Sequence, residues 1–151
     1  MKKILFICHG NICRSPMAEF VMKKLVSEAG MADQFEIASA ATSAEELGNS
    51  VYPPVRSLLA RHGIDCTGKT ARQLRKTDYE KFDYLVGMDS ANFRNINRIC
   101  GGDPEGKIHL LLDYTPCPGD VADPWYTRDF EATWRDVNEG CHGLLKQILE
   151  E

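Results

Sequence analysis

The sequence lacks three features: an apolar run long enough to cross a bilayer, a Lys/Arg run longer than two residues, and a Cys-x-x-Cys pair. These absences argue against a membrane span, a nucleic-acid footprint and a zinc site, respectively. The apolar run at residues 4–7 is also shorter than the roughly 7–15 apolar residues of a secretory signal. We therefore predict a cytoplasmic protein with no metal, no cofactor and neither nucleic-acid nor membrane partners.

The 151 residues, 43% hydrophobic and 26% charged, fit one domain that spans residues 1–151. Short apolar segments predict strands at residues 4–7, 35–38, 84–87 and 108–112. Helical spacing predicts helices at residues 16–29, 53–62, 90–99 and 130–148, and Asp89 is expected to cap the third of them. Because strands alternate with helices, we expect an α/β fold whose parallel sheet is covered by helices on both faces.

The segment CHGNICRSP follows the first predicted strand, at the end of the sheet where α/β folds bind ligands. It places Cys8 and Arg14 at the Cys-x5-Arg spacing of a phosphate-binding loop. The spacing alone is weakly specific, because Cys66 and Arg72 repeat it. The context is more specific, since a strand precedes the loop and Pro16 suits the first turn of a helix after it.

Residues 63–70 form a competing pattern, because they fit the nucleotide-binding motif G-x-x-x-x-G-K-[ST]. A nucleotide loop must leave a strand and enter a helix, so that its amides and the helix dipole face the phosphates. Gly63 instead follows a predicted helix, in the position of a C-terminal cap. Nucleotide binding is therefore the less favoured interpretation.

The residue types of the first loop suit the binding of an oxyanion. Its amides can converge on one anion, with Gly10 allowing a left-handed bend. Asn11, which tolerates unusual backbone angles, can tie the loop through its side chain. Arg14 offers a planar fork to two phosphate oxygens, and Ser15 is expected to cap the helix or to bond the Cys8 sulfur. The helix N-terminus and the guanidinium favour a thiolate at Cys8. The predicted phosphate loop comprises His9, Gly10, Asn11, Ile12, Cys13, Arg14 and Ser15.

Residues 8–19, CHGNICRSPMAE, closely resemble the signature of the low-molecular-weight protein tyrosine phosphatases, and residues 122–126, ADPWY, resemble their Asp-Pro-aromatic loop. The resemblance covers essentially the whole chain, in matching order. It implies a four-stranded parallel sheet flanked by helices, and a metal-free, two-step hydrolysis of phosphotyrosine in protein substrates. In that reaction Cys8 forms a phosphocysteine and Arg14 stabilises the equatorial oxygens. Asp123 protonates the leaving oxygen and then activates water.

The resemblance also implies redox regulation. Cys13 looks like a resolving thiol, which would form a disulfide with an oxidised Cys8 and divert it from irreversible oxidation. No secretory context supports structural disulfides, so we expect the remaining cysteines to be reduced. These are Cys66, Cys100, Cys117 and Cys141.

The expected substrate pocket favours an aromatic phosphate. Ile12 stands where the related protein-arginine phosphatases typically have Thr, and Trp125 and Tyr126 could wall a cleft that phosphoserine is too short to fill. Glu45 and Glu46 occupy the region where many relatives carry an aromatic pocket wall. This pair of carboxylates predicts a preference for basic residues beside the phosphotyrosine.

Lys69 is a second departure, because relatives often have a His near this position that supports the loop through Ser15. We therefore expect the rigidity of the loop and the pH profile of the protein to differ from the family pattern.

The sequence leaves three alternatives. A protein-arginine-phosphatase and a thioredoxin-linked arsenate reductase share the fold and the loop spacing. The reductase needs two further neighbouring cysteines, however, and the cysteines downstream of the loop are separated by at least 17 residues. A non-catalytic phosphate-binding module would not need Cys8, Arg14 and Asp123 together.

Overall fold

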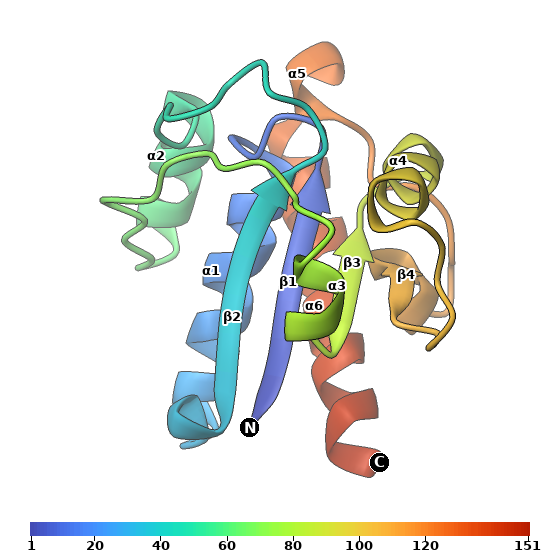
Figure 1. Cartoon of the computed structure of the whole chain (residues 1–151). Helices are drawn as coiled ribbons and strands as arrows, with labels where there is room; N and C mark the ends of the chain where they lie inside the picture. The colour runs from blue at the N-terminus through green and yellow to red at the C-terminus, as the bar shows by residue number, and fades with distance from the viewer.

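The computed structural model describes residues 1–151. Four parallel strands form one sheet in the order β2-β1-β3-β4 (Figure 1). The strands are β1 (Lys2–Cys8), β2 (Phe35–Ala41), β3 (Tyr84–Gly87) and β4 (Ile108–Leu110). The α-helices are α1 (Arg14–Glu28), α2 (Pro53–Arg61), α3 (Asp78–Lys81), α4 (Ser90–Cys100), α5 (Pro124–Thr127) and α6 (Phe130–Glu150). Two 3₁₀ turns, η1 (Ala32–Gln34) and η2 (Leu111–Tyr114), complete the chain.

The central strand β1 supplies both hydrophobic cores. Ile4 and Phe6 pack into the core that contains α1, α2 and α6, whereas Leu5 and Ile7 pack into the core that contains α4 and residues around α3. This alternation follows from the two-residue period of a strand, and it explains why the sequence shows a continuous apolar run instead of an alternating one. The predicted α/β fold, with helices on both faces of a four-stranded parallel sheet, is confirmed.

The order of the strands creates a crevice at their carboxyl ends. The chain passes from β1 to β2 on one side of β1, and β3 then pairs with the other side of β1. The segments that follow β1 and β3 therefore diverge, which is where ligands bind in such sheets. Cys8 ends β1, Asp89 follows β3, and α5 lies beyond the same ends of the strands (Figure 1).

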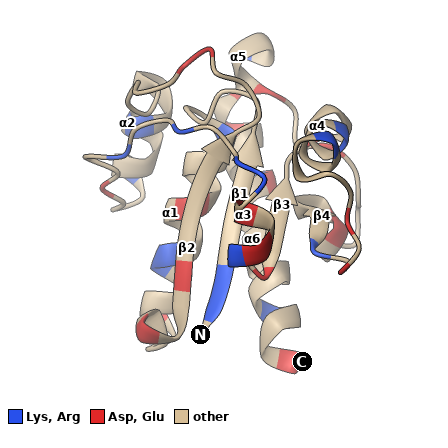
Figure 2. Ribbon diagram, in the orientation of Figure 1, with Lys and Arg blue, Asp and Glu red and all other residues tan.

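The fourth strand is shorter than predicted, because it ends at Leu110 and the chain then turns into η2. There Leu111 packs directly on α6 at Gly140, where an added Cβ would overlap its side chain. The short helices α3 and α5 were not predicted, since four residues are too few to show a helical period. Figure 2 shows charges of both signs dispersed over the helices and loops. None of the helices combines the length and the apolarity that a membrane span requires.

Candidate active site

Cys8 lies at the point where β1 gives way to the loop, and it is 3% exposed. Its sulfur accepts a hydrogen bond from the Asn11 amide at 3.3 Å and lies 3.0 Å from Ser15 Oγ. Ser15 does not cap α1, because Cys13 occupies the N-cap position. Of the two roles predicted for Ser15, the structure therefore adopts the contact with Cys8.

Asn11 makes the left-handed turn of the loop, with φ of 60°. The prediction that Gly10 makes this turn is wrong, because Gly10 has no positive φ. Asn tolerates the left-handed region when its side chain is bonded locally. Here Asn11 Nδ2 donates to Ser15 Oγ at 2.7 Å and to Ser39 Oγ at 2.9 Å, and Oδ1 accepts from the Arg72 amide at 3.2 Å.

The loop presents backbone donors that the protein does not use itself. The N–H groups of His9, Gly10, Ile12 and Cys13 donate to no protein atom, whereas that of Asn11 points at the Cys8 sulfur. Free backbone amides gathered in one loop form an anion-binding nest. The loop can therefore hold a tetrahedral oxyanion beside Cys8.

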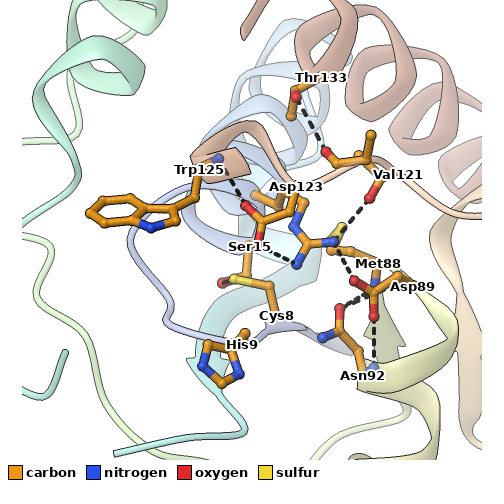
Figure 3. Close-up of polar contacts among 12 residues, drawn as sticks. Cys8, His9, Ser15, Met88, Asp89, Asn92, Val121, Asp123, Trp125 and Thr133 are labelled. Carbon is orange, nitrogen blue, oxygen red and sulfur yellow. Dashed lines mark hydrogen bonds and ion pairs between the residues drawn. The ribbon is translucent and has the colours of Figure 1, made fainter. Parts of the chain in front are cut away.

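Arg14 is the largest of the fully buried side chains, at 2% exposure. Its Nη1 donates to Asp89 Oδ2 at 2.7 Å and to the Val121 carbonyl at 2.9 Å, and its Nη2 donates to Asp123 Oδ2 at 3.3 Å (Figure 3). Burial alone would lower the pKa of Arg14, but the charge on Cys8 and the two carboxylates outweigh it and raise this pKa. A cation is thus fixed at the edge of the loop.

Asp123 is the N-cap of α5, and its Oδ1 accepts the Trp125 amide at 3.0 Å. This contact leaves Oδ2 directed at Arg14 (Figure 3). Asp123 and Pro124 thus begin α5 next to the phosphate loop. The Asp123 side chain lines the same cavity as Cys8 and Arg14.

That cavity has a volume of about 130 Å³. It is lined by Cys8, His9, Gly10, Ile12, Cys13, Arg14, Glu45, Glu46, Asp123, Trp125 and Tyr126. Every predicted pocket residue is thus on its wall, whereas the loop residues Asn11 and Ser15 lie behind it. Trp125 is 45% exposed and Tyr126 is 80% exposed, so both rings stand at the mouth. At the same mouth His9 Nε2 lies 2.8 Å from Glu45 Oε2.

A buried polar network supports the loop from behind, and two of its members, Glu19 and Ser39, were not predicted from the sequence. Glu19, 4% exposed on α1, accepts the Ser39 hydroxyl at 2.5 Å, and Ser39 in turn bonds Asn11. A carboxylate among the apolar positions of α1 was the signal that could have identified Glu19. Lys69 completes the network by donating to the Ser39 carbonyl at 2.9 Å and lying 3.3 Å from Glu19.

Lys69 therefore acts on the loop through Glu19 and Ser39, and it makes no contact with Ser15. Burial lowers the pKa of Lys69, although Glu19 opposes this shift. Lys69 is also the lysine of the nucleotide-binding pattern at residues 63–70, and here it binds other protein groups. That pattern follows the helix α2 and not a strand. Gly63 has φ of 74°, as expected of a helix cap, so these residues lack the context of a nucleotide loop.

The second Cys-x5-Arg match is structural. Cys66 is 3% exposed, and burial raises the pKa of its thiol. Arg72 forms a bidentate pair with Asp78, at 3.0 and 3.2 Å. Neither residue lines the cavity at Cys8.

Cys13 is buried in the wall of the cavity beside Cys8. Burial, with added repulsion from the negative charges of Cys8 and Asp123, raises the pKa of the Cys13 thiol to about 12. Cys13 is therefore a neutral thiol at physiological pH. All six cysteines are free; Cys117 is exposed, and Cys66, Cys100 and Cys141 are buried.

Comparisons with known proteins show the family of the chain. Residues 3–151 match the family model described as low molecular weight phosphotyrosine protein phosphatase. The chain is 36% identical to the low molecular weight protein-tyrosine-phosphatase YfkJ of Bacillus subtilis, over 100% of this chain and 98% of the relative. It is 40% identical to the low molecular weight phosphotyrosine protein phosphatase of Sus scrofa, over 97% and 96% of the two chains.

Solved structures show the same similarity. The crystal structure of YfkJ superposes with a TM-score of 0.96 at 36% identity, over 99% of this chain and 96% of that one. A Drosophila arginine phosphatase superposes with a TM-score of 0.88 at 27% identity, over 98% of each chain. The shared fold therefore does not by itself separate phosphotyrosine from phosphoarginine substrates.

Proposed function

The chain belongs to the low molecular weight phosphotyrosine protein phosphatase family and is a protein-tyrosine-phosphatase, and we propose that Cys8, Arg14 and Asp123 carry out its reaction. One observation carries this proposal: all three side chains line one cavity, whose loop amides have no protein acceptor. Phosphoproteins are its substrates, and the phosphate would bind in the loop.

In the first step the Cys8 thiolate attacks phosphorus. The S–P bond forms as the bond from phosphorus to the phenolic oxygen breaks, and Asp123 gives its proton to that oxygen. The loop amides and Arg14 surround the equatorial oxygens as charge shifts among them. Ser15, at 3.0 Å from the sulfur, stabilises the thiolate that is consumed and later released.

In the second step water attacks the phosphocysteine. Asp123, now ionised, takes a proton from this water, the S–P bond breaks, and inorganic phosphate leaves. Cys8 is returned as a thiolate and Asp123 as an acid. Cys8, Arg14 and Asp123 thus complete a cycle that balances without a metal or cofactor.

The walls of the cavity support phosphotyrosine as the substrate. Ile12 offers an apolar branch within the loop, and Trp125 and Tyr126 stand at the mouth, where they can flank a phenyl ring. Glu45 and Glu46 add negative charge to the same rim. We therefore expect basic residues near the phosphotyrosine to be favoured over acidic ones.

The test compares phosphotyrosine, phosphoserine and phosphoarginine peptides with wild type, Cys8→Ser and Asp123→Ala. We expect wild type to prefer phosphotyrosine, Cys8→Ser to lose nearly all turnover, and Asp123→Ala to slow the first step most with poor leaving groups. Undiminished turnover by Cys8→Ser would overturn the mechanism. Faster hydrolysis of phosphoarginine would identify the alternative substrate class.

The effect of Glu45 and Glu46 on substrate preference is tested with phosphotyrosine peptides of matched length that differ only in the charge of their flanking residues. Wild type should hydrolyse the basic peptide with the higher kcat/KM, and Glu45→Gln combined with Glu46→Gln should remove most of the difference. Equal turnover of both peptides by wild type would refute this preference.

Cys13 is proposed as the redox partner of Cys8. Both thiols are on the cavity wall, and a sulfenic acid on Cys8 could condense with the Cys13 thiol, releasing water and forming a disulfide. Peroxide-treated protein should contain the Cys8–Cys13 bond by mass spectrometry and regain activity with dithiothreitol. Peroxide inactivation without that bond would exclude the role of Cys13.

A further inference from the structure

Arg128 adopts a backbone conformation that arginine rarely takes. It ends α5 with φ of 60° and ψ of 13°, in the left-handed region that favours glycine. Its amide donates to the Pro124 carbonyl at 2.9 Å, which closes the single turn of α5 five residues after Asp123. Strain of this kind in a non-glycine residue persists where surrounding contacts compensate for it.

The compensating contacts belong to the Arg128 side chain. Nη2 donates to the Tyr52 hydroxyl at 3.0 Å, and the guanidinium carbon lies 5.4 Å from the Tyr52 ring and 5.2 Å from the Phe130 ring. Arg128 is exposed, so it is not needed to pair a buried polar group. The side chain therefore connects α5 to Tyr52, which is 76 residues away in the sequence.

Tyr52 is in turn fixed to the phosphate loop, because its amide donates to the Ile12 carbonyl at 2.9 Å. Its ring also lies 5.0 Å from the Trp125 ring, centre to centre, so Tyr52 contacts both ends of α5. On the other side of Asp123, the Val121 amide bonds the Met88 carbonyl at 2.8 Å. Asp123 thus lies between the anchored Val121 and α5, and the hydrogen bond from Arg128 to Tyr52 joins α5 to the segment that is fixed to the phosphate loop.

We propose that Arg128 is a positioning residue for Asp123, which it acts on by fastening α5 to Tyr52 and hence to the phosphate loop. The proposal rests on the proposed function of Asp123 as the general acid. Without Arg128, the side-chain contact of α5 with Tyr52 is reduced to the Trp125 ring. Arg14 still holds the other side of Asp123, but Asp123 samples positions from which proton transfer is slower. A general acid acts only within hydrogen-bond reach of the leaving oxygen, so this loss falls on the chemical step.

The test measures the burst of released phenol, which reports phosphocysteine formation, for phenyl phosphate and p-nitrophenyl phosphate. Phenol needs the proton from Asp123, whereas p-nitrophenolate leaves well without it. Arg128→Gly should slow the burst about tenfold with phenyl phosphate and change it less than about twofold with p-nitrophenyl phosphate. Tyr52→Phe, which keeps the ring and removes the hydroxyl, should shift the ratio of the two rates in the same direction.

Folding does not obscure this result, because glycine suits the φ of 60° at this position and Arg128→Gly should keep or raise the unfolding midpoint. Arg135→Ala is the matched control, since Arg135 is an exposed arginine of α6. It should leave both burst rates unchanged. Equal slowing of both substrates by Arg128→Gly, or no slowing of either, would overturn the proposal.

The variant Asp123→Asn distinguishes the positioning role of Arg128 from the acid role of Asp123. If Asp123→Asn shows no selective loss with phenyl phosphate, the acid role of Asp123 fails, and the positioning role fails with it. If Asp123→Asn shows that loss and Arg128→Gly does not, only the positioning role fails. In the Asp123→Asn background, Arg128→Gly should have no further effect on the ratio of the two rates.

Discussion

Asp89 has two separable tasks, because each of its carboxylate oxygens has its own partner. Oδ1 accepts the Asn92 amide at 2.7 Å and caps α4, while Oδ2 accepts Arg14 Nη1 at 2.7 Å (Figure 3). Serine caps helices about as well as aspartate but is too short to reach the guanidinium. Asp89→Ser therefore removes the contact with Arg14, and Asp89→Ala removes the cap as well.

The size of the effect follows from these contacts. A hydrogen bond to a charged group contributes about 1.5–3 kcal/mol, and about 1.4 kcal/mol corresponds to a tenfold change in rate. Because the Val121 carbonyl still holds Nη1 of Arg14, the lower end of that range applies. We expect Asp89→Ser to lower kcat/KM for a phosphotyrosine peptide about tenfold. Asp89→Ala should do the same and lose about 1 kcal/mol more of unfolding free energy.

The assay combines steady-state kinetics with urea unfolding of both variants. Asp65→Ser is the control, since Asp65 is an exposed carboxylate that bonds only Thr67. It should match wild type in kcat/KM. A value for Asp89→Ser within about twofold of wild type would show that Asp89 does not hold Arg14 during turnover, and would refute the reasoning.

Three further predictions concern stability and thiol reactivity. Lys69→Met should lower the free energy of unfolding by about 1.5 kcal/mol and reduce kcat, because it removes one of the two ammonium partners of the buried Glu19 and leaves Lys23 as the other; unchanged urea unfolding would contradict this. At pH 7 iodoacetamide should label Cys8 and spare Cys13, since the pKa of Cys13 is raised to about 12; peptide mapping that finds Cys13 modified as readily as Cys8 in the wild-type protein would be inconsistent with that value. Burial alone would raise the pKa of Asp103, but three hydrogen bonds lower it. The ionised Asp103 therefore stabilises the folded state above its unfolded pKa of about 3.9, and this contribution is lost as the pH falls below that value. Asp103→Asn should lower the free energy of unfolding by about 1–2 kcal/mol at pH 7 and by progressively less in acid, as measured by urea unfolding at each pH.

Features of the fold that depend on local chemistry were predictable from the sequence. The strand β3 and the capped start of α4 follow from an apolar run and an N-capping Asp89, and both lie where the sequence placed them. The strand–loop–helix context of Cys8 is equally local. The left-handed residue was assigned wrongly, because Gly10 is the more permissive residue, whereas Asn11 is stabilised there by Ser15 and by the distant Ser39.

The remaining parts of the site depend on contacts between distant segments. Asp89 was predicted only as a helix cap, yet its second oxygen meets Arg14, 75 residues away, because β1 and β3 are neighbours in the sheet. Glu19 and Ser39 meet for a similar reason, since α1 packs on β2. No period or spacing in the sequence specifies which carboxylate approaches which donor; the register of the strands decides it.

The two carboxylates around Arg14 are not equivalent, and this difference is required by the chemistry. In the proposed first step Asp123 gives a proton to the leaving oxygen, whereas Asp89 only has to hold Arg14. Asp89 takes the shorter contact with the guanidinium, 2.7 Å against 3.3 Å for Asp123. Without Asp89, Nη1 of Arg14 keeps only the Val121 carbonyl, so the guanidinium holds Asp123 less firmly in place. Asp89→Ser should therefore lose more activity with phenyl phosphate than with p-nitrophenyl phosphate, and equal losses would mean that Asp89 serves phosphate binding alone.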